Sequence, residues 1–342
     1  MERSLPPPGD RQRSTRSMTN QLSQKHGDRL AAARRSLHGL SVGDAFGERF
    51  FGQPERVLAM IESRTLPTPP WKYTDDTVMA ISIVDVLAES RRVDPDRLAD
   101  LFVRRYRRDP SRGYGATAHE VLSAIGAGIP WPTAAARPFD GTGSMGNGAA
   151  MRAAPIGAYF APDYRVVVDA ARVSAAVTHA HPDGQAGAIA VAVAAAWVTR
   201  GAGSVRQLFE AVLEHTPDGD TRSGIARAER VADSIHVRDA ASTLGNGSSV
   251  ISSDTVPYCI WCVARHLDRF EDAMWTTVSG LGDRDTTCAI VGGIVAMHPQ
   301  AQIPQEWSEA REPLENAGGV SRSALPPVIH GDSHASTDRT AD

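Results

Sequence analysis

Two clusters of aspartate and threonine, one near each end of the chain, constrain its fold more than any other feature. The first is Thr74-Asp75-Asp76-Thr77, and the second is Gly282-Asp283-Arg284-Asp285-Thr286-Thr287. Each cluster is followed at once by an apolar stretch with helical spacing. Both clusters therefore start helices, and Asp and Thr are residues that satisfy the free N–H groups of a helix N-terminus.

Helix capping alone does not need so many polar groups. One cap residue is enough for a helix, whereas each cluster carries a surplus of carboxyl and hydroxyl groups. Crowded carboxylates repel one another unless a cation lies between them, and oxygen-only ligand sets suit Mg²⁺, Ca²⁺ or Mn²⁺ rather than Zn²⁺. Capping remains the alternative for either cluster alone, but together they indicate a cation site shared by two distant parts of the chain.

Composition sets limits on the class of protein. The chain has 342 residues, of which 42% are hydrophobic and 22% charged, enough for one large domain or two ordinary ones. A net charge of -4 gives no overall basic field, so we expect no stable nucleic-acid partner. The most apolar run, 186–198, is too short to cross a bilayer. Cys259 and Cys262 lie in one apolar run, which fits free thiols in a reducing cytosol and predicts a cytoplasmic protein.

The pattern is helical nearly throughout residues 29–314, and strand alternation is almost absent. The segments 1–28 and 315–342 are polar, and we expect both to be disordered tails. Amphipathic spacing predicts helices at 98–108, 116–125, 164–177, 205–214, 225–235 and 270–279. The sequence therefore predicts one compact all-α, multi-helix domain at 29–314, with glycine-rich loops between the helices.

One glycine-rich loop, 141–148, matches the G-x-G-x-x-G dinucleotide fingerprint. Prolines 130, 132 and 138 precede it and argue against the strand that this fingerprint requires. Small residues still expose consecutive N–H groups, and a helix expected near Ala149 would add its positive end, so the loop suits a phosphate. A flexible surface turn is the alternative. His179 ends a predicted helix, where it could meet a ligand or only favour the last carbonyls.

Six motifs occur in a fixed order: Gly39-x-x-x-Gly43-Asp44-Ala45-Phe46-Gly47, Thr74-Asp75-Asp76-Thr77, Gly146-Asn147-Gly148-Ala149-Ala150-Met151-Arg152-Ala153-Ala154-Pro155, Thr178-His179-x-His181-Pro182, Asp254-Thr255-Val256-Pro257, and Gly282-Asp283-Arg284-Asp285-Thr286-Thr287. In this order they resemble the ADP-ribosylglycohydrolase family, which includes the dinitrogenase reductase-activating glycohydrolase. The resemblance covers essentially the whole folded unit.

This resemblance implies an all-α fold with two Mg²⁺ (or Mn²⁺) ions at its centre. The matching metal ligands would be Thr74, Asp75, Asp76, Asp283, Asp285 and Thr286. The family cleaves the N- or O-glycosidic bond at the anomeric carbon of ADP-ribose attached to a target, so the expected partner is an ADP-ribose moiety on a modified protein or nucleic acid.

The resemblance also implies roles for the loops. Residues Gly143, Ser144, Met145, Gly146 and Asn147 would line the diphosphate, Gly113, Tyr114 and Gly115 would form a neighbouring substrate loop, and His179 would contact the distal sugar or phosphate. Asp75 or Asp76 would accept a proton from the attacking water, and Asp285 and Glu48 complete the candidate catalytic residues.

One departure from the family concerns a loop acid. Several members carry a Glu at the position that is Phe51 here, and the nearest acid is Glu48, which either replaces it or is a solvated loop residue. Arginine, serine, O-acetyl-ADP-ribose and base linkages stay open, with arginine favoured. Two other classes also remain: a metal-dependent hydrolase of a nucleotide-like phosphoester, and a non-catalytic ADP-ribose binder.

Overall fold

The computed structural model describes residues 8–201, 203–232 and 234–314, with side chains from residue 24 onward. The helices are α1 (Pro8–Glu48), α2 (Pro54–Glu62), α3 (Asp75–Ser90), α4 (Pro95–Arg108), α5 (Ala116–Gly126), α6 (Trp131–Ala136), the 3-10 helix η1 (Asn147–Ala149), α7 (Ala154–Phe160), α8 (Tyr164–Ala176), α9 (Pro182–Thr199), α10 (Val205–His215), α11 (Asp220–Ala228), α12 (Val237–Leu244), α13 (Ser252–Arg265), α14 (Phe270–Ser279), α15 (Arg284–Val295) and α16 (Gln305–Ala310). Within these residues, β-type pairing is limited to two isolated bridges. The all-α prediction is confirmed.

Three expected boundaries differ from the structure. Helix α1 begins at Pro8 rather than near residue 29, because the residues between Gly9 and Gly27 include no proline and are mostly compatible with a helix. Helix α11 ends at Ala228, and the later apolar residues of the predicted 225–235 helix pack on the core from a turn. The helix expected near Ala149 is only the short η1, and α7 starts at Ala154. The C-terminal tail, 315–342, lies outside the described residues.

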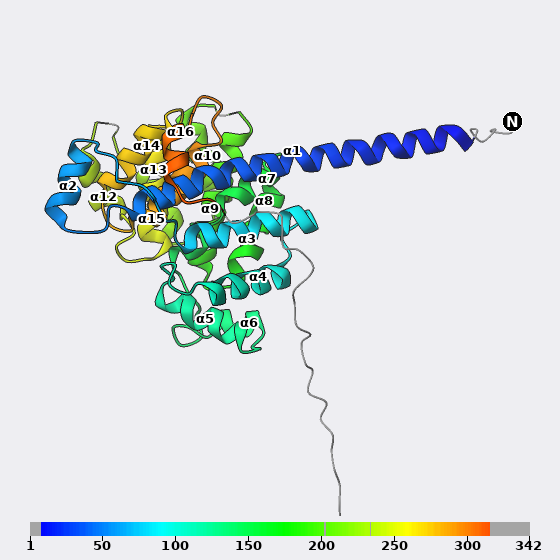
Figure 1. The fold of residues 1–342 in the computed structure, drawn as a ribbon, viewed down its shortest axis with the longest axis horizontal. Coiled ribbons are helices and arrows are strands. Elements are labelled where there is room, and N and C mark those ends of the chain that lie inside the picture. The colour runs from blue at the N-terminus through cyan, green and yellow to red at the C-terminus, as the bar shows by residue number, and fades with distance from the viewer. Residues whose placement is uncertain (1–7, 202, 233, 315–342) are drawn as a thin grey trace, which may run out of the picture.

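Helices α1 and α15 pack backbone to backbone through glycines (Figure 1). A Cβ atom added to Gly39, Gly43 or Gly47 would lie 2.3, 2.1 or 2.2 Å from the nearest atom, which in the last two cases is a carbonyl oxygen of α15. Real Cβ atoms do not approach other atoms so closely, so only glycine permits this crossing. The crossing brings the N-terminal end of α15, with the second acidic cluster, against the C-terminal end of α1.

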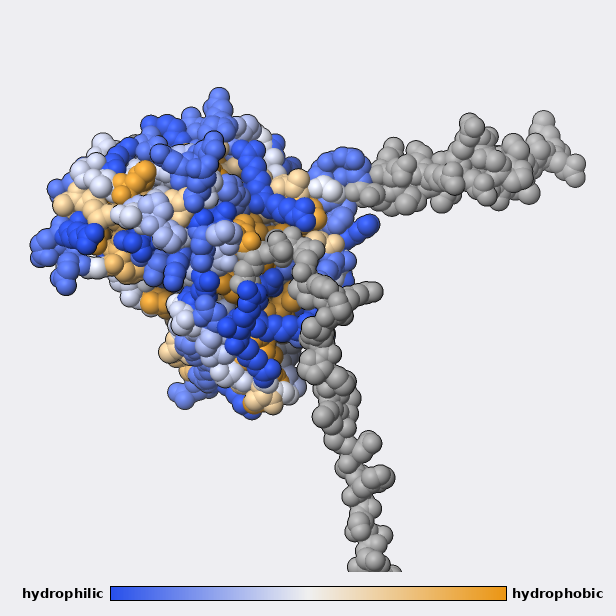
Figure 2. All heavy atoms as spheres, in the orientation of Figure 1, coloured by the Kyte–Doolittle hydropathy of each residue, from blue (hydrophilic) through white to orange (hydrophobic). Residues whose placement is uncertain are grey.

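Helix α9 forms the centre of the core. Its alanine-rich segment from Ala186 to Val198 is almost completely buried and packs against α7, α8, α10, α13 and α15. None of the described helices is both long and apolar enough to cross a membrane. The face in Figure 2 is mostly hydrophilic, with apolar residues in small patches.

Helix α16, the last of the described helices, packs against the segment that precedes the first acidic cluster. Trp307 stacks on Phe46, with ring centroids 4.6 Å apart, and contacts Trp71 edge-on at 5.7 Å. The backbone then pairs with the segment before Thr74, since Trp71 N donates to Ala310 O and Glu312 N donates to Trp71 O. The polypeptide just before the cluster is therefore held by both the core and the C-terminal segment.

Candidate active site

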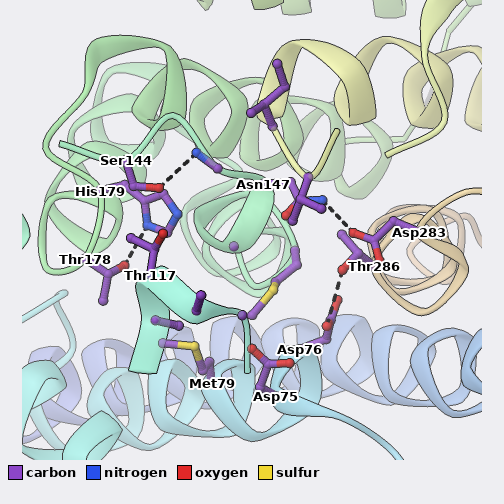
Figure 3. Close-up of a pocket in the computed structure, with 18 of the residues that line it drawn as sticks. Asp75, Asp76, Met79, Thr117, Ser144, Asn147, Thr178, His179, Asp283 and Thr286 are labelled. Atoms are coloured by element: carbon purple, nitrogen blue, oxygen red, sulfur yellow. Dashed lines mark hydrogen bonds between the residues drawn. The ribbon is translucent and has the colours of Figure 1, made fainter. Parts of the chain in front are cut away.

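A cavity of about 640 Å³ opens between the acidic clusters and the glycine-rich loops. It is lined by Asp75, Asp76, Met79, Gly113, Gly115, Ala116, Thr117, Ala118, Phe139, Ser144, Met145, Gly146, Asn147, Gly148, Met151, Arg152, Thr178, His179, Ser249, Val250, Ile251, Asp283, Asp285 and Thr286. Figure 3 shows carboxylates at one end of the cavity and Ser144, Thr178 and His179 at the other. The cavity thus joins an acidic end to an end of neutral donors.

The start of α3 forms the first part of the acidic end. Thr74 caps the helix through its side chain, which accepts a hydrogen bond from Asp76 N. Behind it, the fully buried Asp44 of α1 accepts bonds from the backbone N–H and the hydroxyl of both Thr74 and Thr77, at 2.5–3.1 Å. Asp44 therefore fixes how the cluster faces the cavity. Asp44 belongs to the first of the six ordered motifs, but no role for it was predicted from the sequence.

The second cluster meets the first at the acidic end of the cavity. The Thr286 hydroxyl lies 3.4 Å from Asp76 Oδ2, to which it donates. Asn147, from the glycine-rich loop, donates its side-chain amide to Asp283 Oδ2 at 2.7 Å. A second glycine-rich turn braces this cluster, since Asp283 N donates to Asn246 O. Residues far apart in sequence thus form one acidic centre.

Burial and mutual repulsion make the carboxylates hard to ionise. Burial, followed by the charge of Asp44, raises the pKa of Asp75 to about 8. The pKa values of Asp76 and Asp285 are raised well above their ordinary value by burial and then by neighbouring carboxylates. Each of these two has a buried Oδ1 atom without a hydrogen-bond partner. Oxygens that are buried, repelled and unpartnered are what a bound cation would satisfy.

The donor set therefore fits a hard divalent cation, as the sequence predicts. It consists of carboxylate and hydroxyl oxygens from two helix starts, which Mg²⁺ and Mn²⁺ favour. As the side chains stand, no three His, Cys, Asp or Glu residues in the described part of the chain form a ready-made metal site.

The glycine-rich loop forms the opposite wall, but in a different way from that expected. The Gly146 N–H donates to the Ser144 hydroxyl at 3.1 Å, and the Asn147 N–H donates to Val250 O at 3.1 Å. These two N–H groups are thus used within the protein rather than exposed in a row, which corrects the sequence analysis. The Gly146 N–H stabilises the loop itself, and the Asn147 N–H holds the loop against the 249–252 segment. Side chains, including Ser144 and His179, supply donors at this end.

Four of the residues proposed from the sequence do not line the cavity. Thr74 lies buried behind Asp76, and Gly143 packs its backbone against Ala180 and His181. The Tyr114 ring turns away to pack on Tyr106 and His119.

Glu48 is the fourth proposed residue that does not line the cavity. It is the last residue of α1, and burial raises the pKa of its carboxyl, an effect to which the charge of Asp283 adds.

The structure adds cavity residues that the sequence analysis did not assign. Phe139 and Val250 line the cavity while remaining 60% and 54% exposed, so they form an apolar rim. Arg152 is the only Arg or Lys among the described residues that line the cavity, and it is fully buried. Arg152 and Thr178 belong to two of the six ordered motifs, and this membership is the sequence signal that marks them as candidates for the site. Nothing in the sequence marked Phe139 or Val250.

Comparison with known proteins is consistent with this arrangement. A family model described as ADP-ribosylglycohydrolase matches residues 25–329. The chain is 30% identical over 340 residues to the ADP-ribosylhydrolase ARH3 of Mus musculus, covering 86% of this chain and 91% of that protein. It is 31% identical over 293 residues to an uncharacterized protein of Archaeoglobus fulgidus, covering 82% and 92%.

The fold also has a solved counterpart. A structure described as an ADP-ribosylglycohydrolase-related protein complex superimposes with a TM-score of 0.55 at 23% identity, covering 84% of this chain and 93% of the other. At this identity the likeness shows a shared fold.

Proposed function

The chain belongs to the ADP-ribosylglycohydrolase family of glycosyl hydrolases, and from this premise we propose that it releases ADP-ribose from a modified target by attack of water at the anomeric carbon. The observation that carries the proposal is the single cavity that joins a carboxylate centre to a wall of neutral donors. Such a cavity has one end suited to glycosidic chemistry and another suited to a nucleotide.

The dimensions and surface of the cavity suit ADP-ribose. A volume of about 640 Å³ falls within the usual range for sites that enclose a small molecule. The apolar rim of Phe139 and Val250 offers a surface on which a flat base could pack. Ser144 and His179 face the same cavity and can bond to phosphate or sugar oxygens.

The family is metal-dependent, and we propose that two Mg²⁺ or Mn²⁺ ions bind at the acidic end. The residues that would hold them are Thr74, Asp75, Asp76, Asp283, Asp285 and Thr286. Such ions, when bound, orient ribose hydroxyls and stabilise charge on oxygen. Asp44 and Asn147 hold the ligands in place from behind, through the hydrogen bonds described above.

The carboxylates of the chain perform the proton transfers in this proposal. Asp75 or Asp76 accepts a proton as the water oxygen bonds to the anomeric carbon and the glycosidic bond breaks. The same carboxyl then returns that proton to the departing group, so the products are free ADP-ribose and the unmodified target. The transition state carries positive charge at the sugar, which the carboxylates, Asp285 included, stabilise. Glu48, at the edge of this centre, adds a further negative charge.

The linkage is the finer part of the proposal, and arginine is favoured only because it is the commoner assignment among bacterial-type members of the family. The test measures ADP-ribose released from arginine-linked, serine-linked and base-linked substrates and from O-acetyl-ADP-ribose, with Mg²⁺ or Mn²⁺ and with EDTA. Metal-dependent release from the arginine substrate alone supports the full proposal. Release only from another substrate replaces the linkage but keeps the hydrolase.

Two other outcomes would overturn the proposed activity. Release of inorganic phosphate in place of ADP-ribose would identify a phosphoester hydrolase acting on a nucleotide-like substrate. Tight binding of ADP-ribose without release from any of the substrates would identify a binding protein.

A further inference from the structure

Arg152 is a buried cation in the wall of the cavity, with only 1% of its surface exposed. Its guanidinium donates to Gly148 O at 3.0 Å, to Ser174 O at 3.1 Å and to the Thr178 hydroxyl at 2.8 Å. It also lies over the Phe102 ring, 4.6 Å from the ring centroid. Because an arginine has donors and no acceptors, every one of these oxygens must accept.

This requirement sets the direction of the next hydrogen bond. The Thr178 oxygen also lies 2.7 Å from Nδ1 of His179. The oxygen accepts from Arg152, so the one hydroxyl hydrogen of Thr178 is available for Nδ1. The Thr178 oxygen has a second lone pair, but among the contacts of this hydroxyl in the described residues only Nδ1 can accept its hydrogen, so the arrangement that uses this hydrogen has Nδ1 accepting. In a neutral imidazole, a ring that accepts at one nitrogen carries its proton on the other, here Nε2.

The ring stays neutral, and its Nε2 faces the glycine-rich loop. Burial, and then the charge of Arg152, lower the pKa of His179 to about 3. A Cβ atom added to Gly146 or Gly148 would lie 3.3 or 3.5 Å from Nε2. The glycines thus leave free the space in front of this nitrogen, and Figure 3 shows His179 at the end of the cavity away from the carboxylates.

We propose that Arg152 and Thr178 are positioning residues that hold His179 in its Nε2–H form, so that it donates to an acceptor oxygen of the bound diphosphate. The identity of this ligand rests on the proposed function. A donor with no net charge binds a phosphate oxygen without placing a second cation beside the buried Arg152. An N–H donor also bonds more strongly to a charged phosphate oxygen than to a neutral hydroxyl oxygen.

The direct test is nuclear magnetic resonance of the ligand-free protein labelled with ¹⁵N in its histidine rings, at neutral pH. The His179 signals are assigned by their loss in His179→Gln. We expect a protonated Nε2 and an unprotonated, accepting Nδ1. A proton on Nδ1, or on both nitrogens, would overturn the inference, whether or not the protein proves to be a hydrolase.

The functional test uses Thr178→Val, which removes the hydroxyl at nearly unchanged volume. We expect the Kd for ADP-ribose and the KM for the substrate to rise about tenfold, because His179 would no longer be held in the form that donates a hydrogen bond to the charged diphosphate. The value of kcat should change by less than about twofold, since this bond lies at the end of the cavity away from the carboxylates. Thr178→Ser, which keeps the hydroxyl, should restore both values.

Thr276→Val is the matched control. The Thr276 hydroxyl also lies 2.7 Å from a histidine nitrogen, Nε2 of His266, and neither residue lines the cavity. This variant should leave Kd and KM unchanged. Equal effects of Thr178→Val and Thr276→Val, or no effect of Thr178→Val, would refute the positioning role of Thr178. If the wild-type protein releases no ADP-ribose, the proposed function fails. The position of the ring proton still shows whether Arg152 and Thr178 hold His179 in its Nε2–H form.

Discussion

Gly43→Ala tests whether the glycine crossing of α1 and α15 sets the geometry of the acidic centre. The new Cβ atom would lie 2.1 Å from the Cys288 carbonyl oxygen and 2.8 Å from its carbon. Both neighbours are backbone atoms, so no side chain can rotate away. One helix must withdraw by about 1 Å to restore a normal contact distance.

This displacement has an expected cost in both stability and activity. Overpacking of a tight core costs about 1–3 kcal/mol, and for a domain of this size each kcal/mol lowers Tm by roughly 2–4 °C. We therefore expect Gly43→Ala to melt roughly 2–12 °C below the wild type. Asp44 lies on α1 and Asp285 on α15, so a shift of about 1 Å should also lower the rate of ADP-ribose release roughly 100-fold.

Gly27→Ala on the same helix is the control. A Cβ atom added to Gly27 meets nothing within 4 Å, so this change should preserve activity and raise stability by about 0.5–1 kcal/mol, the ordinary gain of alanine over glycine in a helix. Melting is followed by circular dichroism, and activity is measured well below the Tm of each variant. The reasoning is refuted if Gly43→Ala has the Tm and the rate of the wild type.

Three further predictions concern the acidic centre. Asp76→Asn should lower ADP-ribose release by about 100-fold or more. It should also raise the Tm of the EDTA-treated protein, because it removes a buried carboxylate that its neighbours repel, and a lower Tm would contradict this reasoning. In EDTA, the free energy of unfolding should fall as pH rises from about 4 to about 8, since the folded Asp75, with its pKa near 8, still holds a proton that the unfolded chain has lost. Denaturant titration at several pH values measures this free energy, and a rise with pH would exclude the raised pKa of Asp75. Glu312→Ala should weaken Mn²⁺ binding several-fold in calorimetry, because Glu312 accepts a hydrogen bond from Tyr73 N beside the cluster and pairs with Arg112, whose carbonyl accepts from Asp75 N. The control Glu306→Ala, at an exposed residue, should leave Mn²⁺ affinity unchanged. Equal Mn²⁺ affinities of the two variants would refute a supporting role for Glu312.

The sequence predicted the fold class well because the signals for it are local. Apolar spacing marks helices such as α4 and α14 within a few residues of their observed bounds, and the acidic clusters do start α3 and α15. Where prediction failed, as at the end of α11, apolar residues with helical spacing pack from a turn, and spacing alone does not distinguish these cases.

Much of the site depends on contacts that no local pattern contains. Asp44 accepts hydrogen bonds from two residues some thirty positions later, and Arg152, in the turn before α7, donates to Thr178, in the turn after α8. The direction in which Tyr114 turns depends on its packing against Tyr106 and His119. Motif order could place these residues near the cavity but could not say which of them face it.

A crystal structure of the protein with Mn²⁺ and ADP-ribose would show whether one cavity binds both the metal ions and the nucleotide. Anomalous scattering locates the metal independently of the protein. We expect two Mn²⁺ peaks between the side chains of Asp76 and Asp285, with the ribose at this end of the cavity and the diphosphate beside His179. Manganese bound elsewhere, or ADP-ribose outside the cavity, would contradict this expectation.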